Sequence, residues 1–253
     1  MNKLLLLIYF YLVLQMSVVW IIYRLVKNPS IVDVSWPLGL MITGLIYLWT
    51  QPITLRITIV SSLLIIWSLR LASYLWLTRI RKRHVDKRYV QLSDNWKISK
   101  SLGFFLNFQL QAILIFIVSI VFLFIGISQE PDFSLLDILA CCVVIVGIIG
   151  ESIADFQLQY FKSHHKNEVC SIGLWRYSRH PNYFFDWLTW CGFTLFSLHS
   201  AYGWIGVLSP LTLYVIFNYI TGPMTERGSV KAKGQAFIAY QKKTPIFFPR
   251  FKL

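Results

Sequence analysis

The sequence predicts an all-α fold, a polytopic membrane helix bundle with about seven transmembrane helices. Its hydrophobic fraction is 56%, whereas soluble domains are typically about 45–50% apolar. The mean hydropathy is +0.59, and several apolar runs approach the roughly 20 residues that cross a bilayer as a helix. The alternating apolar and polar pattern of a membrane barrel is absent. We therefore expect one membrane domain over residues 1–253 and no separate soluble domain.

Seven apolar segments are the expected spans. Backbone groups inside lipid must be hydrogen-bonded internally, so each segment is predicted to be a helix. The second is short and contains Pro37, Gly39 and Gly44, which predicts a tilted or broken helix. The spans are Leu4–Tyr23, Trp36–Trp49, Ile53–Leu77, Leu102–Ile125, Leu135–Phe156, Tyr183–Leu198 and Trp204–Ile220. Residues 1–101 then hold three spans and a basic loop, and residues 102–253 hold the other four spans.

The charges of the loops predict the orientation. Nearly all of the 24 lysines and arginines follow the first, third, fifth or seventh span. The positive-inside rule then places the N-terminus outside and the C-terminus in the cytosol. The net charge of +13 is thus first a topology signal and implies no nucleic-acid partner. It also favours contact with anionic lipid headgroups or a polyanionic cofactor.

The cysteines and histidines predict no metal site. The four cysteines lack a C-x-x-C spacing, and the five histidines form no H-E-x-x-H pattern. We accordingly expect neither a disulfide framework nor a bound metal.

Polar residues are concentrated in Gly173–Tyr183, directly before the sixth span. Pro181 suits the first turn of a helix, and Ser178 is placed to cap it. Asn182 and Asp186 are four residues apart and would share one helix face. A helix N-terminus flanked by arginines and a histidine favours phosphate binding, so a cofactor phosphate is predicted here. The alternative is that the arginines extend to lipid phosphates.

Two acids in the fifth span form another candidate. Ionisable residues inside a membrane are costly and indicate function. Glu151 and Asp155 are four residues apart and therefore lie on one helix face. They could hold the ribose or amide of a nucleotide cofactor. Alternatively, they pair with Arg176 and Arg179 as a purely structural ion-pair latch.

Arg70 is the charged residue of the third span. Asp33 and Asp155 are its candidate partners, and Trp67 lies one turn earlier on the same face. Asp33 and Trp36 bring an acid and an aromatic ring to a membrane boundary, although Trp36 could be only an interfacial anchor.

The loop after the third span contains His84-Val85-Asp86-Lys87-Arg88-Tyr89. Most of this basic loop is expected to be a solvated face that sets the topology. Asp86, Arg88 and Tyr89 could instead fold over a cofactor site.

The segment Gly173–Phe184 resembles the signature of the steroid 5α-reductase superfamily, and most closely that of its bacterial branch. It is more distantly similar to the isoprenylcysteine carboxyl methyltransferases, which carry Arg-His-Pro-x-Tyr. Further matching residues are Asp155, Glu226, Gly234, Tyr240 and Pro249, with weaker matches at Asp33, Trp36, Asp86, Arg88 and Tyr89. The sequence departs from the pattern at Phe185 in place of glycine and at Asp186 in place of glutamate. Trp67 stands where the eukaryotic steroid reductases have a tyrosine.

The resemblance implies an NADPH-dependent reductase that acts on a double bond of a lipophilic, steroid- or enoyl-like substrate in a bacterial inner membrane, with the cofactor on the cytosolic side. The residues implied to bind the cofactor are Glu151, Asp155, Arg176, Arg179, His180, Asn182, Asp186, Glu226, Tyr240 and Arg250. Asp33, Trp67 and Arg70 would face the substrate, and Tyr183 or Tyr89 would be the proton donor. The alternatives are a methyltransferase that uses S-adenosylmethionine on a lipid-like thiol or carboxylate, and a non-enzymatic lipid-binding protein.

Overall fold

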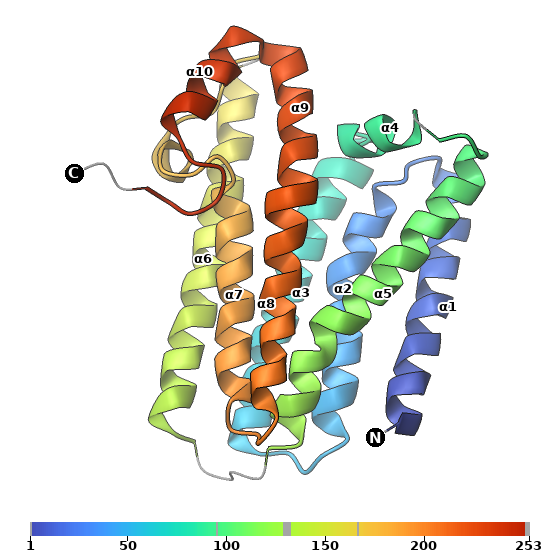
Figure 1. The fold of residues 1–253 in the computed structure, drawn as a ribbon, viewed down its shortest axis with the longest axis vertical. Coiled ribbons are helices and arrows are strands. Elements are labelled where there is room, and N and C mark those ends of the chain that lie inside the picture. The colour runs from blue at the N-terminus through green and yellow to red at the C-terminus, as the bar shows by residue number, and fades with distance from the viewer. Residues whose placement is uncertain (1, 95, 129–132, 166, 251–253) are drawn as a thin grey trace.

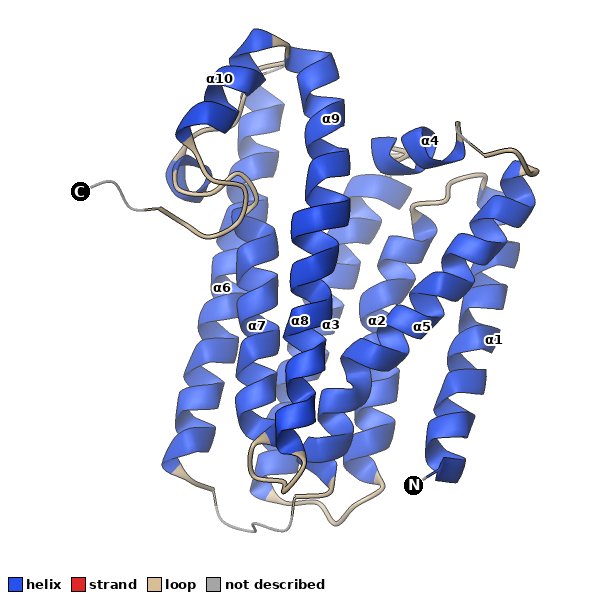
Figure 2. Cartoon of the chain, in the orientation of Figure 1, coloured by secondary structure: helices blue, strands red, loops and turns tan. Residues whose placement is uncertain are grey.

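The computed structural model describes residues 2–94, 96–128, 133–165 and 167–250, and within these ranges all regular structure is helical. Figure 2 shows this helical architecture. The α-helices are α1 (Asn2–Val26), α2 (Ile31–Trp49), α3 (Leu55–Leu75), α4 (Lys87–Ser93), α5 (Lys100–Gly126), α6 (Leu135–His164), α7 (Pro181–Ser197), α8 (Leu208–Val215), α9 (Gly222–Lys233) and α10 (Gln235–Lys243). Short 3₁₀ turns cover Gly173–Arg176 and Gly203–Val207, and π-helical segments cover Trp76–Ile80 and Ile216–Thr221.

Six helical stretches in the described part are long and apolar enough to cross a membrane. They are Asn2–Val26, Ile31–Trp49, Leu55–Ile80, Lys100–Gly126, Leu135–His164 and Gly203–Lys233. The expected membrane bundle is therefore confirmed in its class. The sixth expected span corresponds to α7, which has 17 residues and packs along α6.

The helices form two groups joined by α3 and the inclined α5 (Figure 1). One group contains α1 and α2, and the other contains α6, α7 and the continuous α8–α9 rod. The N-terminus lies at one end of the bundle, and α4, α10 and the C-terminal tail lie at the other. Perpendicular aromatic contacts fill the core between the groups, with Trp190 packed edge-to-face against Trp67, Phe122 and Phe193. This packing holds α3, α5 and α7 in a fixed relation.

Glycines let α6 and α7 approach closely. A Cβ added to Gly147 would lie 2.2 Å from Thr189 Oγ1, and one added to Gly150 would lie 2.3 Å from the Phe185 ring. Small residues at helix contacts are the usual means of close packing in membranes. Phe185 therefore fills the space that Gly150 leaves free on the facing helix.

Two expected boundaries are wrong. The second expected span begins five residues too late, because α2 already starts at Ile31 and includes Asp33. The last helix does not end at Ile220: it continues through a π-helical segment and α9 to Lys233. Pro223 clashes less in this wider turn than in a regular helix. Gly234, which has φ of +55°, separates α9 from α10.

A buried ion pair connects α3 to α6 at the end of the bundle opposite α10. The Arg56 side chain contacts both carboxylate oxygens of Asp137 at 2.7 and 3.0 Å. His199 Nε2 lies 3.2 Å from the same carboxylate, and Asp137 also completes a capping box with Ser134 at the start of α6. Burying a charge is tolerable only when it is paired in this way. Arg56 is thus a structural tie between α3 and α6 rather than an exposed loop charge.

Candidate functional site

Three acids and one arginine meet in the interior, at the junction of α3, α6 and α7. Arg70 Nη1 lies 2.7 Å from Glu151 Oε1, and Arg70 Nη2 lies 2.6 Å from Asp155 Oδ2. Asn182 donates to Asp155 Oδ1 at 3.3 Å, and the Trp67 indole donates to Asp186 Oδ1 at 3.2 Å. We refer to Trp67, Arg70, Glu151, Asp155, Asn182 and Asp186 as the carboxylate cluster.

The carboxylate cluster is buried but incompletely satisfied. Glu151 and Asp155 are each 3% exposed, and Asp186 is 9% exposed. Within the described part of the chain, Glu151 Oε2 and Asn182 Oδ1 are buried and accept no hydrogen bond. Native proteins rarely leave buried polar atoms unpaired, so these oxygens are free to accept hydrogen bonds from a ligand.

The segment before α7 organises the C-terminal region. The Arg179 guanidinium contacts both Glu226 oxygens at 2.7 and 3.1 Å, and His180 Nε2 lies 3.1 Å from Glu226 Oε1. Gln241 donates to Glu226 Oε2 at 2.6 Å, while Arg179 also donates to the Thr244 carbonyl. We call Arg179, His180, Glu226, Gln241 and Thr244 the tail clamp. It connects the start of α7 to α9 and α10.

Backbone contacts extend the tail clamp to the tail itself. The Arg179 N–H donates to the Pro245 carbonyl at 2.9 Å, and Ser178 Oγ donates to the Phe247 carbonyl at 2.7 Å. The Tyr240 hydroxyl donates a hydrogen bond to the Trp175 carbonyl oxygen. Ser178 was expected to cap α7, but His180 occupies the N-cap position, and the Ser178 hydroxyl fastens the tail.

Arg176 and Arg250 are exposed at this end of the molecule. The Arg250 N–H donates to the Tyr177 carbonyl, next to Arg176 in the chain, at 3.0 Å. The tail therefore brings the backbone of Arg250 next to that of Tyr177 and Arg176. Neither arginine contacts Glu151 or Asp155, whose cationic partner is Arg70.

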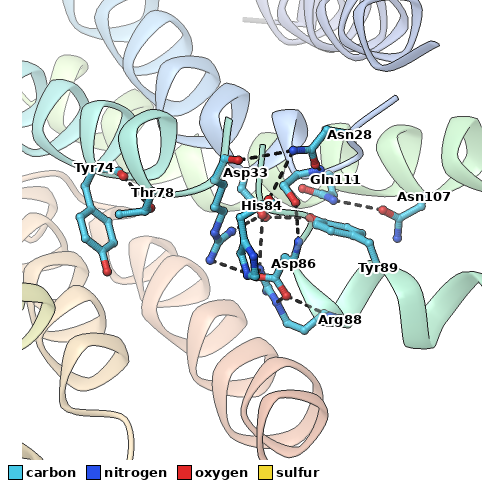
Figure 3. Close-up of polar contacts among 12 residues, drawn as sticks. Asn28, Asp33, Tyr74, Thr78, His84, Asp86, Arg88, Tyr89, Asn107 and Gln111 are labelled. Carbon is cyan, nitrogen blue, oxygen red and sulfur yellow. Dashed lines mark hydrogen bonds and ion pairs between the residues drawn. The ribbon is translucent and has the colours of Figure 1, made fainter. Parts of the chain in front are cut away.

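A second ionic cluster joins α2, the end of α3 and α4 (Figure 3). Asp33 pairs with Arg79 and Arg88 and accepts the Tyr89 hydroxyl at 2.7 Å. Asp86 contacts Arg88 at 2.9 Å and Arg79 at 3.2 Å, and it caps α4. We call Asp33, Arg79, Asp86, Arg88 and Tyr89 the loop clamp. Its two acids and two arginines balance in charge.

The electrostatics of the loop clamp follow from this pairing. Burial opposes the charged form of Asp86, but Arg88 and Arg79 outweigh it and hold the pKa of that carboxyl well below its usual range. Burial and the adjacent Asp33 carboxylate raise the pKa of Tyr89 well above its ordinary value. Asp86 is therefore ionised and Tyr89 protonated at neutral pH.

Tyr183 links the loop clamp to the tail clamp. Its ring stacks on His180 with 5.0 Å between centroids and on Phe217 with 4.7 Å. Phe217 belongs to the π-helical segment before α9, and Arg88 lies within electrostatic reach of the Tyr183 hydroxyl. Both faces of the tyrosine ring are thus covered by protein.

The structure brings most of the expected site residues together, in three groups rather than one. The Arg70–Asp155 pair is confirmed, whereas the alternative pairing of Arg70 with Asp33 is wrong because Asp33 lies in the loop clamp. The role of Arg79 escaped sequence reasoning. Only the structure distinguishes it: Arg79 lies in the π-helical segment Trp76–Ile80, and such segments often occur at functional sites.

A surface groove of about 460 Å³ borders the tail clamp. It is lined by Pro223, Glu226, Arg227, Val230, Lys231, Gln241 and Ile246. The groove does not reach the carboxylate cluster, which is distinguished by its chemistry rather than by an open cavity.

Comparison with known proteins gives a family without an assigned activity. A family model described as "Protein of unknown function (DUF1295)" matches residues 19–244. The chain is 26% identical over 268 residues to "Uncharacterized protein C594.04c" of Schizosaccharomyces pombe, with 92% of this chain and 76% of that protein covered. No solved structure matches the chain.

Proposed function

The chain belongs to the DUF1295 family, and from the residues of its buried site we propose that it is an integral-membrane, NADPH-dependent reductase. Its substrate would be a lipophilic molecule with a polarised double bond, such as a steroid- or enoyl-like compound. The observation that carries the proposal is the carboxylate cluster, in which Arg70 pairs with two acids and Trp67 donates to a third inside the bundle. Such a costly arrangement in a membrane favours a binding site over a structural role.

The residues fit a nucleotide cofactor in two respects. Glu151 Oε2 and Asn182 Oδ1 are buried acceptors without partners, which suit a ribose hydroxyl and a carboxamide N–H. Arg176 and Arg250 are exposed cations near the same end, which suit phosphate groups. The bound cofactor would supply the hydride.

The chain's own residues would orient both reactants and exclude water. Arg70 and Trp67 hold the acids in place from α3, and the surrounding aromatic core keeps the site dry. The tail clamp fixes the start of α7, from which Asn182 and Asp186 project. Tyr183 and Tyr89 are the proposed sources of the proton that follows hydride transfer.

The proposal includes seven crossings, with α7 added to the six candidate spans. The N-terminus would lie outside and the C-terminus in the cytosol, where NADPH is available. The loop clamp, the tail clamp and the basic loops all lie toward the α4 and α10 end, which supports this orientation.

A methyltransferase is the second candidate, because the carboxylate cluster has two more acids than arginines. S-adenosylmethionine carries a sulfonium cation, which the carboxyl oxygens of this cluster would attract. The dihydronicotinamide ring of NADPH is neutral and has no such positive charge. The sequence resemblance to the reductases outweighs this argument.

Ligand-dependent thermal unfolding of the purified protein in detergent tests the proposal. NADPH at about 100 times its Kd should stabilise the folded state by about 2.7 kcal/mol. Asp155→Ala and Asn182→Ala should lose this stabilisation, whereas Ser152→Ala, a control on α6 whose hydroxyl bonds only to the Ile148 carbonyl, should keep it. Stabilisation by S-adenosylmethionine alone would replace the reductase with the methyltransferase. If none of the ligands binds, the non-enzymatic alternative is favoured.

A further inference from the structure

A second groove lies on the outer surface between α2 and α3, away from the carboxylate cluster. It has a volume of about 370 Å³ and is lined by Val34, Ala72, Ser73, Trp76 and Leu77. Trp76 and Leu77 are 48% and 46% exposed, although they lie within the candidate span Leu55–Ile80. The groove is therefore an apolar depression at the C-terminal end of α3.

The groove runs along one ridge of α3. Ser73 lies three residues before Trp76 and four before Leu77, and Ala72 lies four before Trp76, so the four residues follow one side of α3 and of the π-helical segment that continues it. From residue 72 to residue 77 this ridge extends about 7 Å along the helix axis. A short part of an extended hydrocarbon chain fits such a track.

Three basic residues follow the groove directly. The Arg81 N–H donates to the Trp76 carbonyl at 2.9 Å, which places Arg81 one turn beyond Trp76. The chain then turns sharply at Arg83, with φ of +51°, so Arg81, Lys82 and Arg83 leave the helix together. All three are exposed, and none takes part in an ion pair within the described part of the chain.

The acidic side chains near this turn are already paired with other arginines. Asp33 and Asp86, the nearest acids on adjoining elements, are bound by Arg79 and Arg88 within the loop clamp. The loop clamp thus removes both acids and leaves a cationic group of three above an apolar track. This distribution is complementary to a molecule with an anionic head and a hydrocarbon tail.

We propose that the α2–α3 groove and the Arg81–Arg83 turn form a binding site for one anionic glycerophospholipid. An acyl chain would lie along Trp76 and Ser73, and the phosphate would contact the three basic side chains. Each basic side chain near an anionic lipid contributes about 1 kcal/mol, or roughly a fivefold change in affinity. This site is independent of the proposed reductase activity.

Lipid retention measured by native mass spectrometry tests the site. Delipidated wild-type protein would be titrated with dioleoyl phosphatidylglycerol and with dioleoyl phosphatidylcholine, and we expect at least a fivefold preference for the former. Glycerol phosphate without acyl chains should not compete. A wild type that binds both lipids equally, or glycerol phosphate that competes, would overturn the proposal.

Matched variants separate a defined site from diffuse surface charge. Arg81→Gln/Lys82→Gln/Arg83→Gln should abolish the preference, whereas Lys231→Gln/Lys242→Gln/Lys243→Gln, with the same change of three charges on exposed positions, should keep it. Ser73→Trp, which fills the groove, should weaken phosphatidylglycerol binding at least fivefold. Equal losses in both triple variants, or an unchanged affinity in Ser73→Trp, would contradict the site.

Discussion

The carboxylate cluster and the loop clamp contain the same kinds of side chain in different proportions. The loop clamp has two aspartates and two arginines, and each acid contacts both arginines. The carboxylate cluster has three acids and one arginine, and it retains the unpaired oxygens of Glu151 and Asn182. Both connect helices that are far apart in sequence, but only one is complete by itself.

This difference separates a structural ion-pair network from a candidate site. A buried network that satisfies all its members rigidifies the fold, whereas a partly satisfied one is costly. The loop clamp therefore explains how the basic loop is held against α2. The carboxylate cluster requires a further partner, and a ligand is the simplest one. Five predictions test this contrast, from the largest expected effect to the smallest.

Arg70→Gln should have the largest effect on folding. The substitution leaves Glu151, Asp155 and Asp186 together without a cation, and breaking a buried ion pair in this way typically costs about 3–5 kcal/mol. Thermal unfolding in detergent would show the loss. Arg176→Gln, at an exposed position, is the control and should change stability by less than about 0.5 kcal/mol. Equal stability of the two variants would mean that Arg70 does not balance the cluster.

Glu151→Gln should separate binding from folding. It removes one of the excess acids while Asp155 still pairs with Arg70, so the ligand-free protein should be about as stable as wild type. The roughly 2.7 kcal/mol of stabilisation by NADPH at 100 times its Kd should disappear. A variant that unfolds readily without ligand but still binds NADPH would assign Glu151 to the scaffold instead.

Asp33→Asn should show the opposite pattern. Arg79 and Arg88 lose an anionic partner, and hydrogen bonds to charged groups contribute about 1.5–3 kcal/mol each. We expect a loss of about 2 kcal/mol in stability and no change in the Kd of NADPH. Isothermal titration calorimetry beside thermal unfolding would distinguish the two quantities. A weaker affinity for NADPH with an unchanged free energy of unfolding would indicate that Asp33 belongs to the substrate or cofactor site.

Gly150→Ala should test how closely α6 must approach α7. The new methyl group would meet the Phe185 ring, and overpacking of this size costs about 1–2 kcal/mol. The same substitution in a Phe185→Ala background should be neutral or stabilising, because alanine is the better helix former. An equal cost in both backgrounds would show that the two side chains do not compete for one space.

The pH dependence of Asp86 should be the smallest effect. Its pKa is lowered in the folded state, so its stabilisation is fully present above its unfolded pKa of about 4 and is lost as pH falls toward the folded value. Asp86→Asn should therefore be about 1 kcal/mol less stable than wild type at neutral pH. The difference should shrink below about pH 4. A constant difference from pH 7 to pH 3 would contradict this assignment.

Much of the fold could be predicted from the sequence because lipid allows few alternatives. Apolar length alone located most of the helices, and helical spacing placed Glu151 beside Asp155. The continuation of the last helix to Lys233 could not be predicted, because a π-helical segment accommodates Pro223 where a regular helix would break.

The pairings among the expected site residues could not be predicted from the sequence. Asp33 and Asp155 were equal candidates for Arg70, and the packing of α3 against α6 decided between them. Contacts between distant helices depend on such packing, which periodicity within one segment does not report. The inward position of Arg79 could not be predicted for the same reason. It is one of several basic residues in its loop, and only the fold places it against Asp33.

The hydrogen bonds between the tail and the segment before α7 have a consequence for biosynthesis. Pro245 and Phe247 are translated after all six candidate spans of the described chain, and their carbonyls accept hydrogen bonds from the Arg179 N–H and the Ser178 hydroxyl. The start of α7 must therefore remain incompletely bonded while α8, α9 and α10 are still being synthesised and inserted. The tail clamp is therefore completed only after the helices of the bundle have been synthesised.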